Sequence, residues 1–209
     1  MKTAAANLLL VPFKEVRHEQ PDDCLHYEQV AVRGMEMNWT IPAHRHEGLH
    51  QVQFLEQGHI EGTVDGRPVQ ADAPALLLIA AGSVHEFTHT SDTRGHQLTI
   101  PTATLVQLLA GMKLADTGLA GSFALTALTP KARDECMLLF EMLGREFHGH
   151  GAGRVPALMA TATLLAVLLL RLHGEQAQKF KGPGTRDTLV QRYLALVEQH
   201  FREHQSLPY

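Results

Sequence analysis

The sequence predicts a mainly β-sheet domain in its first half, followed by α-helices. Short apolar runs separated every few residues by Pro, Gly or Asp are typical of strands, and such runs occupy residues 25–32, 35–41, 52–55 and 76–79. After about Pro101 the apolar residues no longer recur every second residue but about every 3.6 residues, which indicates helices. These observations predict a β-barrel or β-sandwich with helices appended to it.

A hairpin signal supports the β-structure. Asp65-Gly66 lies between residues 59–64 and 67–70. These two residue types supply the positive-φ positions of a two-residue turn. We therefore expect the two flanking segments to be antiparallel neighbours.

Three helices are predicted after the strands. The first covers roughly residues 103–114, and the third is the apolar run 155–170. The second begins at Thr129-Pro130, an N-cap residue followed by a proline at the first helical position. One face of this second helix carries the apolar stripe Cys136, Phe140, Leu143 and Phe147.

The run 155–170 contains no charge and in this respect resembles a membrane span. It is shorter than the roughly 20 apolar residues that a span needs, and Arg154 and Arg171 bound it. A helix that is apolar on most faces must be covered by protein. We therefore expect a buried or dimer-forming helix and no membrane contact.

The composition restricts the possible functions. With 44% hydrophobic and 19% charged residues, the 209-residue chain can bury a full core. A net charge of -4 with only 18 Lys and Arg argues against a large phosphate-binding surface, so we expect no DNA-contacting residue within this sequence. Cys24 and Cys136 have no paired spacing, so inert thiols are the default. The first 13 residues lack a cleavage pattern, which favours a cytoplasmic protein.

The last residues predict a linker and one more helix. Lys181-Gly182-Pro183-Gly184 is a breaker cluster. After it, residues 187–201 place an apolar stripe on one helical face. Because residues 206–209 look like the interior of a longer sequence, we expect a further domain beyond them.

Clustered histidines are the main chemical signal. His44 and His46 point to the same face of a strand, because the side-chain period of a strand is two. Two imidazoles on one face can share a metal ion, and His85 from another strand completes a facial triad. Gln51 or His50 is a possible fourth ligand. The alternative is that these imidazoles line a polar cavity and bind an organic ligand directly.

The same residues resemble the cupin superfamily. Its first motif is HxH, four residues, Glu, six residues, Gly, and this sequence has His44-x-His46, four residues, Gln51, six residues, Gly58. The second motif, Pro-x-Gly-x-x-His, resembles Ala80-Ala81-Gly82-Ser83-Val84-His85. The resemblance implies a cupin (jelly-roll) β-barrel, mainly β with α, followed by a helical dimerisation region.

Three positions depart from the cupin motifs. Asn38 stands in place of a leading glycine, Gln51 in place of the metal-binding glutamate, and Ala80 in place of the proline. Losing the glutamate removes a negative ligand and a possible base. Zinc is the metal that we expect if the histidines bind one, and no organic cofactor is expected.

Nearly the whole chain also resembles the AraC-type transcription regulators that respond to hydroxylated aromatic acids, the group of PobR and HpaA. The matching segments are residues 11–13, 42–46 with 49–51, 73–79, and 192–201. The resemblance implies a 4-hydroxybenzoate-like effector bound in the barrel, genes of aromatic catabolism as targets, a homodimer formed by the helices, and DNA bound by a C-terminal domain beyond Tyr209.

This resemblance divides the chain into three parts. Residues 1–101 are the effector-binding cupin barrel, and residues 102–180 are the helical dimerisation and linker region. Residues 181–209 are a linker and the first helix of a helix-turn-helix domain.

An aromatic acid needs an apolar slot and a few polar partners. The polar candidates of the barrel are His44, His46, His50, Gln51 and His85. Trp39, Phe54 and Phe87 could wall the aromatic ring, although large aromatics also serve as plain core. Arg45 alternates with His44 and His46, so we expect it to point outward.

No catalytic residue is assigned, and we do not expect an enzyme. The main alternative is a metal-dependent cupin enzyme such as a dioxygenase or isomerase. The missing glutamate and the helical tail argue against that alternative. A third possibility is a binding or storage cupin without a regulated output.

Overall fold

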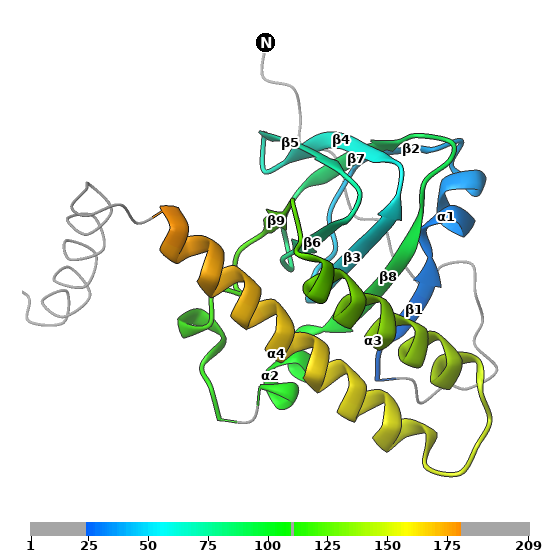
Figure 1. Cartoon of the computed structure of the whole chain (residues 1–209), viewed down its shortest axis with the longest axis vertical. Coiled ribbons are helices and arrows are strands. Elements are labelled where there is room, and N and C mark those ends of the chain that lie inside the picture. Colours follow the sequence, from blue (N-terminus) through cyan, green and yellow to red (C-terminus); the bar gives the residue numbers. More distant parts are fainter. Residues whose placement is uncertain (1–23, 110, 181–209) are drawn as a thin grey trace, which may run out of the picture. The chain divides into compact units, whose positions relative to one another are not determined.

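Figure 1 shows the computed structural model of the chain, which describes residues 24–109 and 111–180. The chain separates into two compact units, residues 1–173 and 174–209. The elements described below lie in the first unit, except that the last helix continues beyond it. The predicted linker, the predicted helix 187–201 and the matching segment 11–13 lie outside the described residues.

The described part of the chain contains nine strands, four α-helices and one 3-10 turn. In order they are β1 (His26–Gln29), α1 (Val30–Glu36), β2 (Thr40–His44), β3 (Leu49–Gln57), β4 (His59–Val64), β5 (Arg67–Asp72), β6 (Ala75–Ile79), β7 (His85–His89), β8 (Arg94–Pro101), α2 (Thr102–Leu108), a 3-10 turn (Leu114–Asp116), β9 (Phe123–Leu125), α3 (Pro130–His148) and α4 (Arg154–Phe180).

The strands form two antiparallel sheets. One sheet has the order β1-β8-β3-β6-β9 and the other has the order β2-β7-β4-β5. Figure 1 shows α3 and α4 lying across the outer face of the five-stranded sheet. The predicted architecture, a β-barrel or β-sandwich followed by helices, is confirmed.

The predicted hairpin is also confirmed. Asp65 and Gly66 have φ values of 50° and 73° and connect β4 to β5, with Val64 paired to Arg67. Asp65 binds the loop before β7 as well, because its backbone N–H donates to the carbonyl of Val84 at 2.8 Å and its Oδ1 accepts from the Val84 N–H at 2.9 Å. The turn therefore fixes the chain just ahead of His85.

The five-stranded sheet is buried on both faces, so neighbouring residues of one strand enter different cores. Phe54 of β3 belongs to a core shared with the helices, which we call the helix-side core. Leu55, the next residue, belongs to a core between the two sheets, which we call the interior core. Strand β6 alternates in the same way, with Leu76 in the helix-side core and Leu77 in the interior core. Burial on both faces explains why residues 76–79 are continuously apolar.

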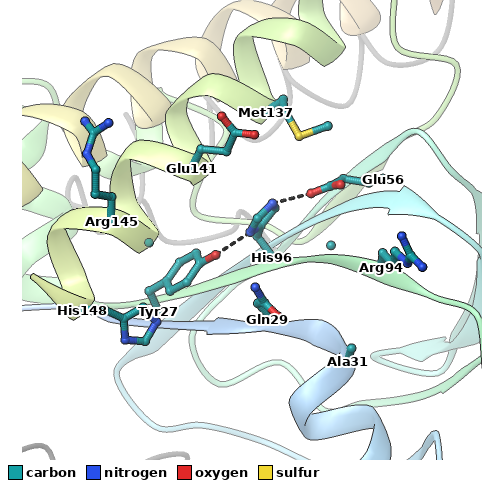
Figure 2. Close-up of a pocket in the computed structure, with 12 residues that line it drawn as sticks. Tyr27, Gln29, Ala31, Glu56, Arg94, His96, Met137, Glu141, Arg145 and His148 are labelled. Carbon is teal, nitrogen blue, oxygen red and sulfur yellow. Dashed lines mark hydrogen bonds and ion pairs between the residues drawn. The ribbon is translucent and has the colours of Figure 1, made fainter.

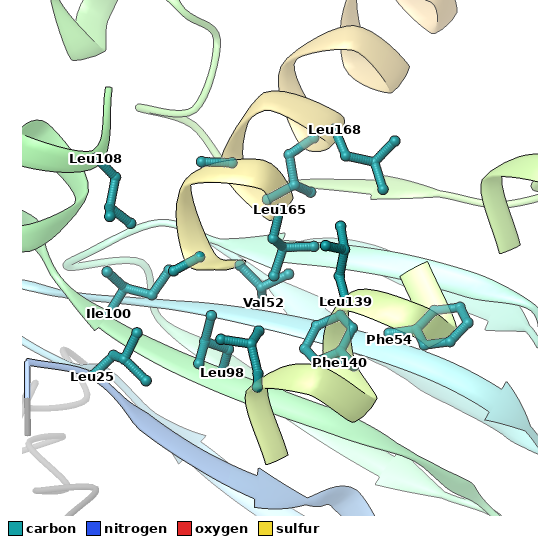
Figure 3. Close-up of a cluster of buried hydrophobic side chains, with 14 of the residues drawn as sticks. Leu25, Val52, Phe54, Leu98, Ile100, Leu108, Leu139, Phe140, Leu165 and Leu168 are labelled. Carbon is teal, nitrogen blue, oxygen red and sulfur yellow. The ribbon is translucent and has the colours of Figure 1, made fainter. Parts of the chain in front are cut away.

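Helix α3 provides a large share of the helix-side core (Figure 3). The side chain of Thr129 accepts a hydrogen bond from the N–H of Ala132 at 3.2 Å, and Pro130 follows it, as the sequence predicts. The predicted stripe is buried throughout: Cys136, Phe140, Leu143 and Phe147. Burial raises the pKa of the Cys136 thiol to about 12, so this thiol stays protonated and unreactive.

Helix α4 is longer than the predicted run and also packs on the helix-side core. Leu158, Leu165 and Leu169 are fully buried in that core, whereas Leu164 is 56% exposed. By length and composition alone, residues 154–177 could cross a membrane, and 39% of the apolar window is buried within the protein. Its buried face confirms the expected role as a packed helix.

A buried arginine fixes the connection between the two helices. Arg154 at the start of α4 donates from Nε to the carbonyl of Glu146 at 2.9 Å and from a terminal nitrogen to the carbonyl of Phe147 at 2.7 Å. The last carbonyls of a helix lack partners within the helix and carry partial negative charge, so a guanidinium satisfies both needs. The α3–α4 connection is therefore held by more than apolar packing.

Two sequence predictions were wrong in detail. Residues 30–36 form the helix α1 rather than strand, because Val30 and Gly34 are buried one helical turn apart and the sheet ends at Gln29. The first predicted helix, 103–114, is cut short at Leu108, and Gly111 with a φ of 88° interrupts it.

The predicted change to helices after Pro101 was also incomplete, because β9 follows α2. This three-residue strand pairs with β6 and covers its free edge. Its length is too short for a strand pattern to be recognised in the sequence.

We expect Phe140→Ala to lower the free energy of unfolding by about 3–5 kcal/mol, because the ring is fully buried and stacks on Phe54 and His96. Lys131→Ala, at a side chain of the same helix that is 86% exposed, should change it by less than about 0.5 kcal/mol. Denaturant unfolding measures both values. Similar losses for the two variants would contradict the described orientation of α3.

Candidate ligand and metal site in the sandwich

Three histidines meet inside the sandwich. His44 ends β2, His46 follows in the next loop, and His85 begins β7, where it pairs with His44 across the two strands. One ring nitrogen from each residue lies within 4.8 Å of the others, and all three side chains are buried. The predicted triad is therefore assembled from segments about 40 residues apart in the sequence.

Backbone carbonyls orient two of these rings. His44 Nδ1 lies 2.7 Å from the carbonyl oxygen of Pro42, and His85 Nδ1 lies 3.0 Å from that of Ser83. A carbonyl oxygen only accepts, so each Nδ1 carries the proton and each Nε2 keeps its lone pair. This is the arrangement in which histidine ligands of metal ions are usually held.

Burial favours the neutral form of two of these rings. Burial, together with the nearby His44, lowers the pKa of His85 to about 4. The pKa of His44 is also lowered by burial. Three neutral nitrogen donors at one point suit a borderline divalent cation such as Zn²⁺, and such an ion can also bind an oxygen atom of a ligand. The described residues therefore fit a metal ion.

A hydrogen-bonded row of amide side chains stands beside the triad. Gln53 Nε2 donates to Gln97 Oε1 at 2.7 Å, and Gln97 Nε2 donates to Glu28 Oε1 at 2.7 Å. Arg33 completes the row through an ion pair with Glu28 at 3.3 Å. Because each member orients the next, this wall of the site is rigid.

Two buried polar atoms of this region have no hydrogen-bond partner among the described residues: Gln53 Oε1 and Thr99 Oγ1. Buried polar atoms are normally satisfied, so a water molecule or a ligand atom is expected there. The cavity shared by His44, His46, Gln51 and Gln53 has a volume of about 30 Å³. That volume is close to the share of one water molecule in the liquid.

The structure brings together some of the predicted site residues. Gln51 lines the same small cavity as His44 and His46. Phe87 belongs to the interior core, and its ring centroid lies 5.8 Å from that of His85.

The other predicted residues lie away from the triad. His50 alternates with Gln51 along β3, so it lies on the strand face that carries Val52 and Phe54 of the helix-side core. Phe54 accordingly stacks on Phe140 of α3 rather than walling the interior. Trp39 is half-buried against Gly34 of α1.

Arg45 points outward as predicted. Its side chain is 48% exposed and pairs with Glu47 at 3.1 Å. It is therefore unavailable to a ligand inside the sandwich.

A larger cavity that the sequence did not reveal opens between the two sheets. Its volume is about 380 Å³, which falls in the usual range for small-molecule sites. The apolar part of its lining is Val64, Val69, Leu77, Ile79 and Phe123. Asp65, Arg67 and Ser122 supply polar groups. The unpredicted strand β9 forms one wall, so no local pattern indicated this cavity.

Comparison with known proteins agrees with the fold. Residues 32–101 match the Cupin domain family. The molecule is thus a cupin β-sandwich of two antiparallel sheets followed by two packed helices, with a buried histidine triad.

Solved structures resemble the chain at low sequence identity. A ToxT variant from Vibrio cholerae is 7% identical over 85% of this chain and 65% of its own, with a TM-score of 0.47. The Cnp3 cupin domain of Schizosaccharomyces pombe is 17% identical over 35% of this chain and 55% of its own, with a TM-score of 0.29. A variant of salicylate 1,2-dioxygenase from Pseudoaminobacter salicylatoxidans is 18% identical over 51% of this chain and 26% of its own, with a TM-score of 0.28.

These resemblances concern the fold alone. The chain spans less than two thirds of the length of each of these three structures. No curated protein matches the sequence significantly. None of the comparisons is specific to the PobR and HpaA group, so that narrower assignment is a matter for proposal.

One further interior histidine makes the stability depend on pH. His89 is 4% exposed, neither of its ring nitrogens has a hydrogen-bond partner within the described ranges, and burial lowers its pKa to about 4. The unfolded chain takes up this proton near pH 6.5, whereas the folded chain does so only near pH 4. Stability is therefore complete above pH 6.5 and falls as the pH drops toward 4.

We expect His89 to account for about 3 kcal/mol of that loss between pH 6.5 and pH 4. His89→Leu should reduce the slope of unfolding free energy against pH in this window by about 1.4 kcal/mol per pH unit. Denaturant unfolding at a series of pH values measures the slope. An unchanged slope would show that the folded protein protonates His89 as readily as the unfolded chain.

Proposed function

We propose that this chain is the effector-sensing part of an AraC-type transcription regulator of aromatic catabolism. It binds a small hydroxylated aromatic acid, with 4-hydroxybenzoate as the best candidate. The observation that supports this function most directly is an apolar cavity of about 380 Å³ with an arginine at its edge, inside a cupin sandwich that shows no cluster of acidic groups beside its described histidine triad. Such a cavity suits recognition of an aromatic anion.

The aromatic ring is assigned to this cavity rather than to the triad. The space beside His44, His46 and Gln51 is only about 30 Å³, which is too small for an aromatic ring. In the larger cavity, Leu77 and Ile79 offer apolar contacts to the ring.

Polar groups at the edge of the same cavity match the two ends of a hydroxybenzoate. Arg67 can bind the carboxylate through two hydrogen bonds. Asp65 and Ser122 can bind the hydroxyl group, since one accepts and the other both donates and accepts.

The triad is proposed to hold zinc. A divalent ion bound by three neutral imidazoles accepts an additional oxygen ligand and polarises it. Because Gln51 replaces the carboxylate of the cupin motif, the site retains the full positive charge of the ion. Together with the rigid row of Gln53 and Gln97, this arrangement favours a structural or ligand-binding ion.

The helical region is proposed to form a homodimer, and DNA would be bound by a domain that this sequence does not contain. Val155 and Leu164 of α4 and Leu138 of α3 are large apolar residues on the helix surface, 42%, 56% and 57% exposed. Exposed apolar positions on neighbouring helices are typical of subunit contacts. A bound effector would act by shifting the helices at that contact. Such a regulator works in the cytoplasm without membrane contact.

A metal-dependent enzyme is the second candidate. The triad favours it, because three histidine ligands leave positions open for substrate and oxygen or water. The neutral Gln51 weighs against it, because the carboxylate that does line this small cavity, Glu28, is held by Gln97 and paired with Arg33. Oxygen consumption with 4-hydroxybenzoate in the presence of Fe²⁺ would support the enzyme and contradict a pure sensor.

We expect 4-hydroxybenzoate at 100 times its dissociation constant to raise the free energy of unfolding by about 2.7 kcal/mol. Thermal-shift titration of the protein measures the effect. Arg67→Gln should weaken binding about tenfold or more, because it removes the charged partner of the carboxylate. Arg45→Gln, at an exposed arginine outside the cavity, should leave binding unchanged.

The pattern across analogues checks the specificity. Benzoate lacks the hydroxyl group and should bind more weakly than 4-hydroxybenzoate, by about fivefold for one lost hydrogen bond. Absence of any stabilisation by aromatic acids would remove this effector class.

We also expect the purified protein to bind about one Zn²⁺ ion per chain. His46→Ala and His85→Ala should each abolish this binding, because the two histidines that remain are too few ligands to hold the ion. His150→Ala, at an exposed histidine outside the site, is the matched control. Elemental analysis after dialysis measures the metal content, and equal zinc in all four proteins would exclude the triad as the binding site.

A further inference from the structure

A cleft on the helix side of the five-stranded sheet is separate from the site described above. It lies between α3 and the strands β1, β3 and β8, and its volume is about 660 Å³ (Figure 2). Its lining combines two glutamates, two arginines and a tyrosine hydroxyl with apolar groups such as Met137. None of the triad histidines contributes to it.

A hydrogen bond and an ion-pair contact link three side chains on the floor of this cleft. The Tyr27 hydroxyl lies 2.6 Å from His96 Nδ1, and His96 Nε2 contacts the carboxylate of Glu56 (Figure 2). The Tyr27 hydroxyl and His96 Nδ1 share this hydrogen bond, and the opposite side of the ring faces the Glu56 carboxylate. A hydroxyl oxygen has two lone pairs, so whichever of the two atoms donates, Tyr27 keeps at least one lone pair for a ligand that donates a hydrogen bond.

Two carboxylates, Glu56 and Glu141, line the same cleft as this oxygen. Burial, together with the charges of Glu56 and Glu141, raises the pKa of Tyr27 to about 12, so the phenol stays protonated. Figure 2 shows the Glu141 side chain projecting from α3 on the same side of the helix as Met137. Glu141 has no ion pair within the described part of the chain. The centre of the cleft is thus rich in acceptors and negative charge, which suits a cationic group.

Gly144 in the middle of α3 gives room to this arrangement. A Cβ atom at this position would lie 2.8 Å from the Tyr27 hydroxyl oxygen and ring. Glycine in a helix interior costs about 1 kcal/mol relative to alanine. Glycine at this position therefore lowers the stability of the helix itself but lets α3 pack directly against Tyr27.

The ends of the cleft carry the opposite charge. Arg94 and Arg145 line it at opposite ends, and His148 lies beside Tyr27 at the Arg145 end (Figure 2). The Arg145 side chain is 71% exposed, and its pair with Glu146 is long, at 3.7 Å. It is therefore available to an anionic group.

We propose that this cleft binds a small zwitterion of the amino-acid type. Its ammonium group would lie among Glu56, Glu141 and the Tyr27 oxygen, and its carboxylate would face Arg145. The proposal does not depend on an aromatic effector or on DNA binding. Because the site joins α3 to the sheet, a ligand bound there would fix the position of that helix on the sandwich.

Methyl NMR of Met137 tests the proposal directly, because this side chain lines the cleft. We expect at least one of the twenty common amino acids to shift the Met137 methyl signal saturably below about 10 mM. The Met137→Leu variant identifies that signal. No shift with any of the twenty would overturn the proposal.

Variants and analogues define the chemistry. Glu141→Gln should weaken binding about tenfold and Tyr27→Phe about fivefold. Glu135→Gln, on α3 but outside the cleft, is the matched control and should bind as the wild type does. Equal affinity of Glu141→Gln and the wild type would place the ligand elsewhere.

The last experiment compares the affinity of the best amino-acid ligand with that of its decarboxylated amine and that of its deaminated acid. Each should bind at least about tenfold more weakly than the zwitterion, because each loses one charged contact. Equal binding of either analogue would overturn the assignment of a zwitterion. Arg67→Gln should affect 4-hydroxybenzoate alone, so failure of one proposal is distinguishable from failure of the other.

Discussion

Burial of the five-stranded sheet on both faces governs the architecture. Strands β3, β6 and β8 place alternate residues in the helix-side core and in the interior between the sheets. The helix side is filled by large apolar groups such as Phe54 and Phe140, which dock α3 and α4. The interior is mixed, with apolar residues at one end and amides with histidines at the other. The helix-side cleft uses one face of this sheet and the apolar cavity uses the other, whereas the triad histidines come from the facing four-stranded sheet.

The polar end of the interior is tolerated because its groups satisfy one another. Buried amides and imidazoles are costly unless they are hydrogen-bonded. Gln53, Gln97 and Glu28 form a continuous row, and the backbone carbonyls two residues before His44 and His85 hold those two rings. Gln53 Oε1 and Thr99 Oγ1 are among the buried atoms without a hydrogen-bond partner in the described residues, and a bound water or ligand atom would satisfy them. A water molecule or a small ligand is therefore expected in this part of the interior.

The spacing of residues along the sequence predicts part of the fold and of the histidine site, but not all of it. The Asp65-Gly66 turn and the HxH pair were predictable, because each depends on residues adjacent in the sequence. Strict alternation along β3 would also have separated His50 and Phe54 from the triad, since both have the opposite parity to Gln51. In contrast, β9 depends on β6 being left with an open edge, and α1 depends on Val30 and Gly34 finding partners in the folded sheet. Neither of these tertiary contacts can be predicted from the pattern of neighbouring residues in the sequence.

The two buried faces of β3 also limit how this protein can change over evolution. A one-residue insertion or deletion within β3 would exchange the compartments of every residue that follows it. Amides such as Gln53 would enter an apolar helix contact, and Phe54 would enter the polar interior. The loop residues 111–113 after α2 are exposed, so an extra residue there leaves both cores untouched. Length variation among homologues is therefore expected to concentrate in such loops, while β3 keeps a constant length.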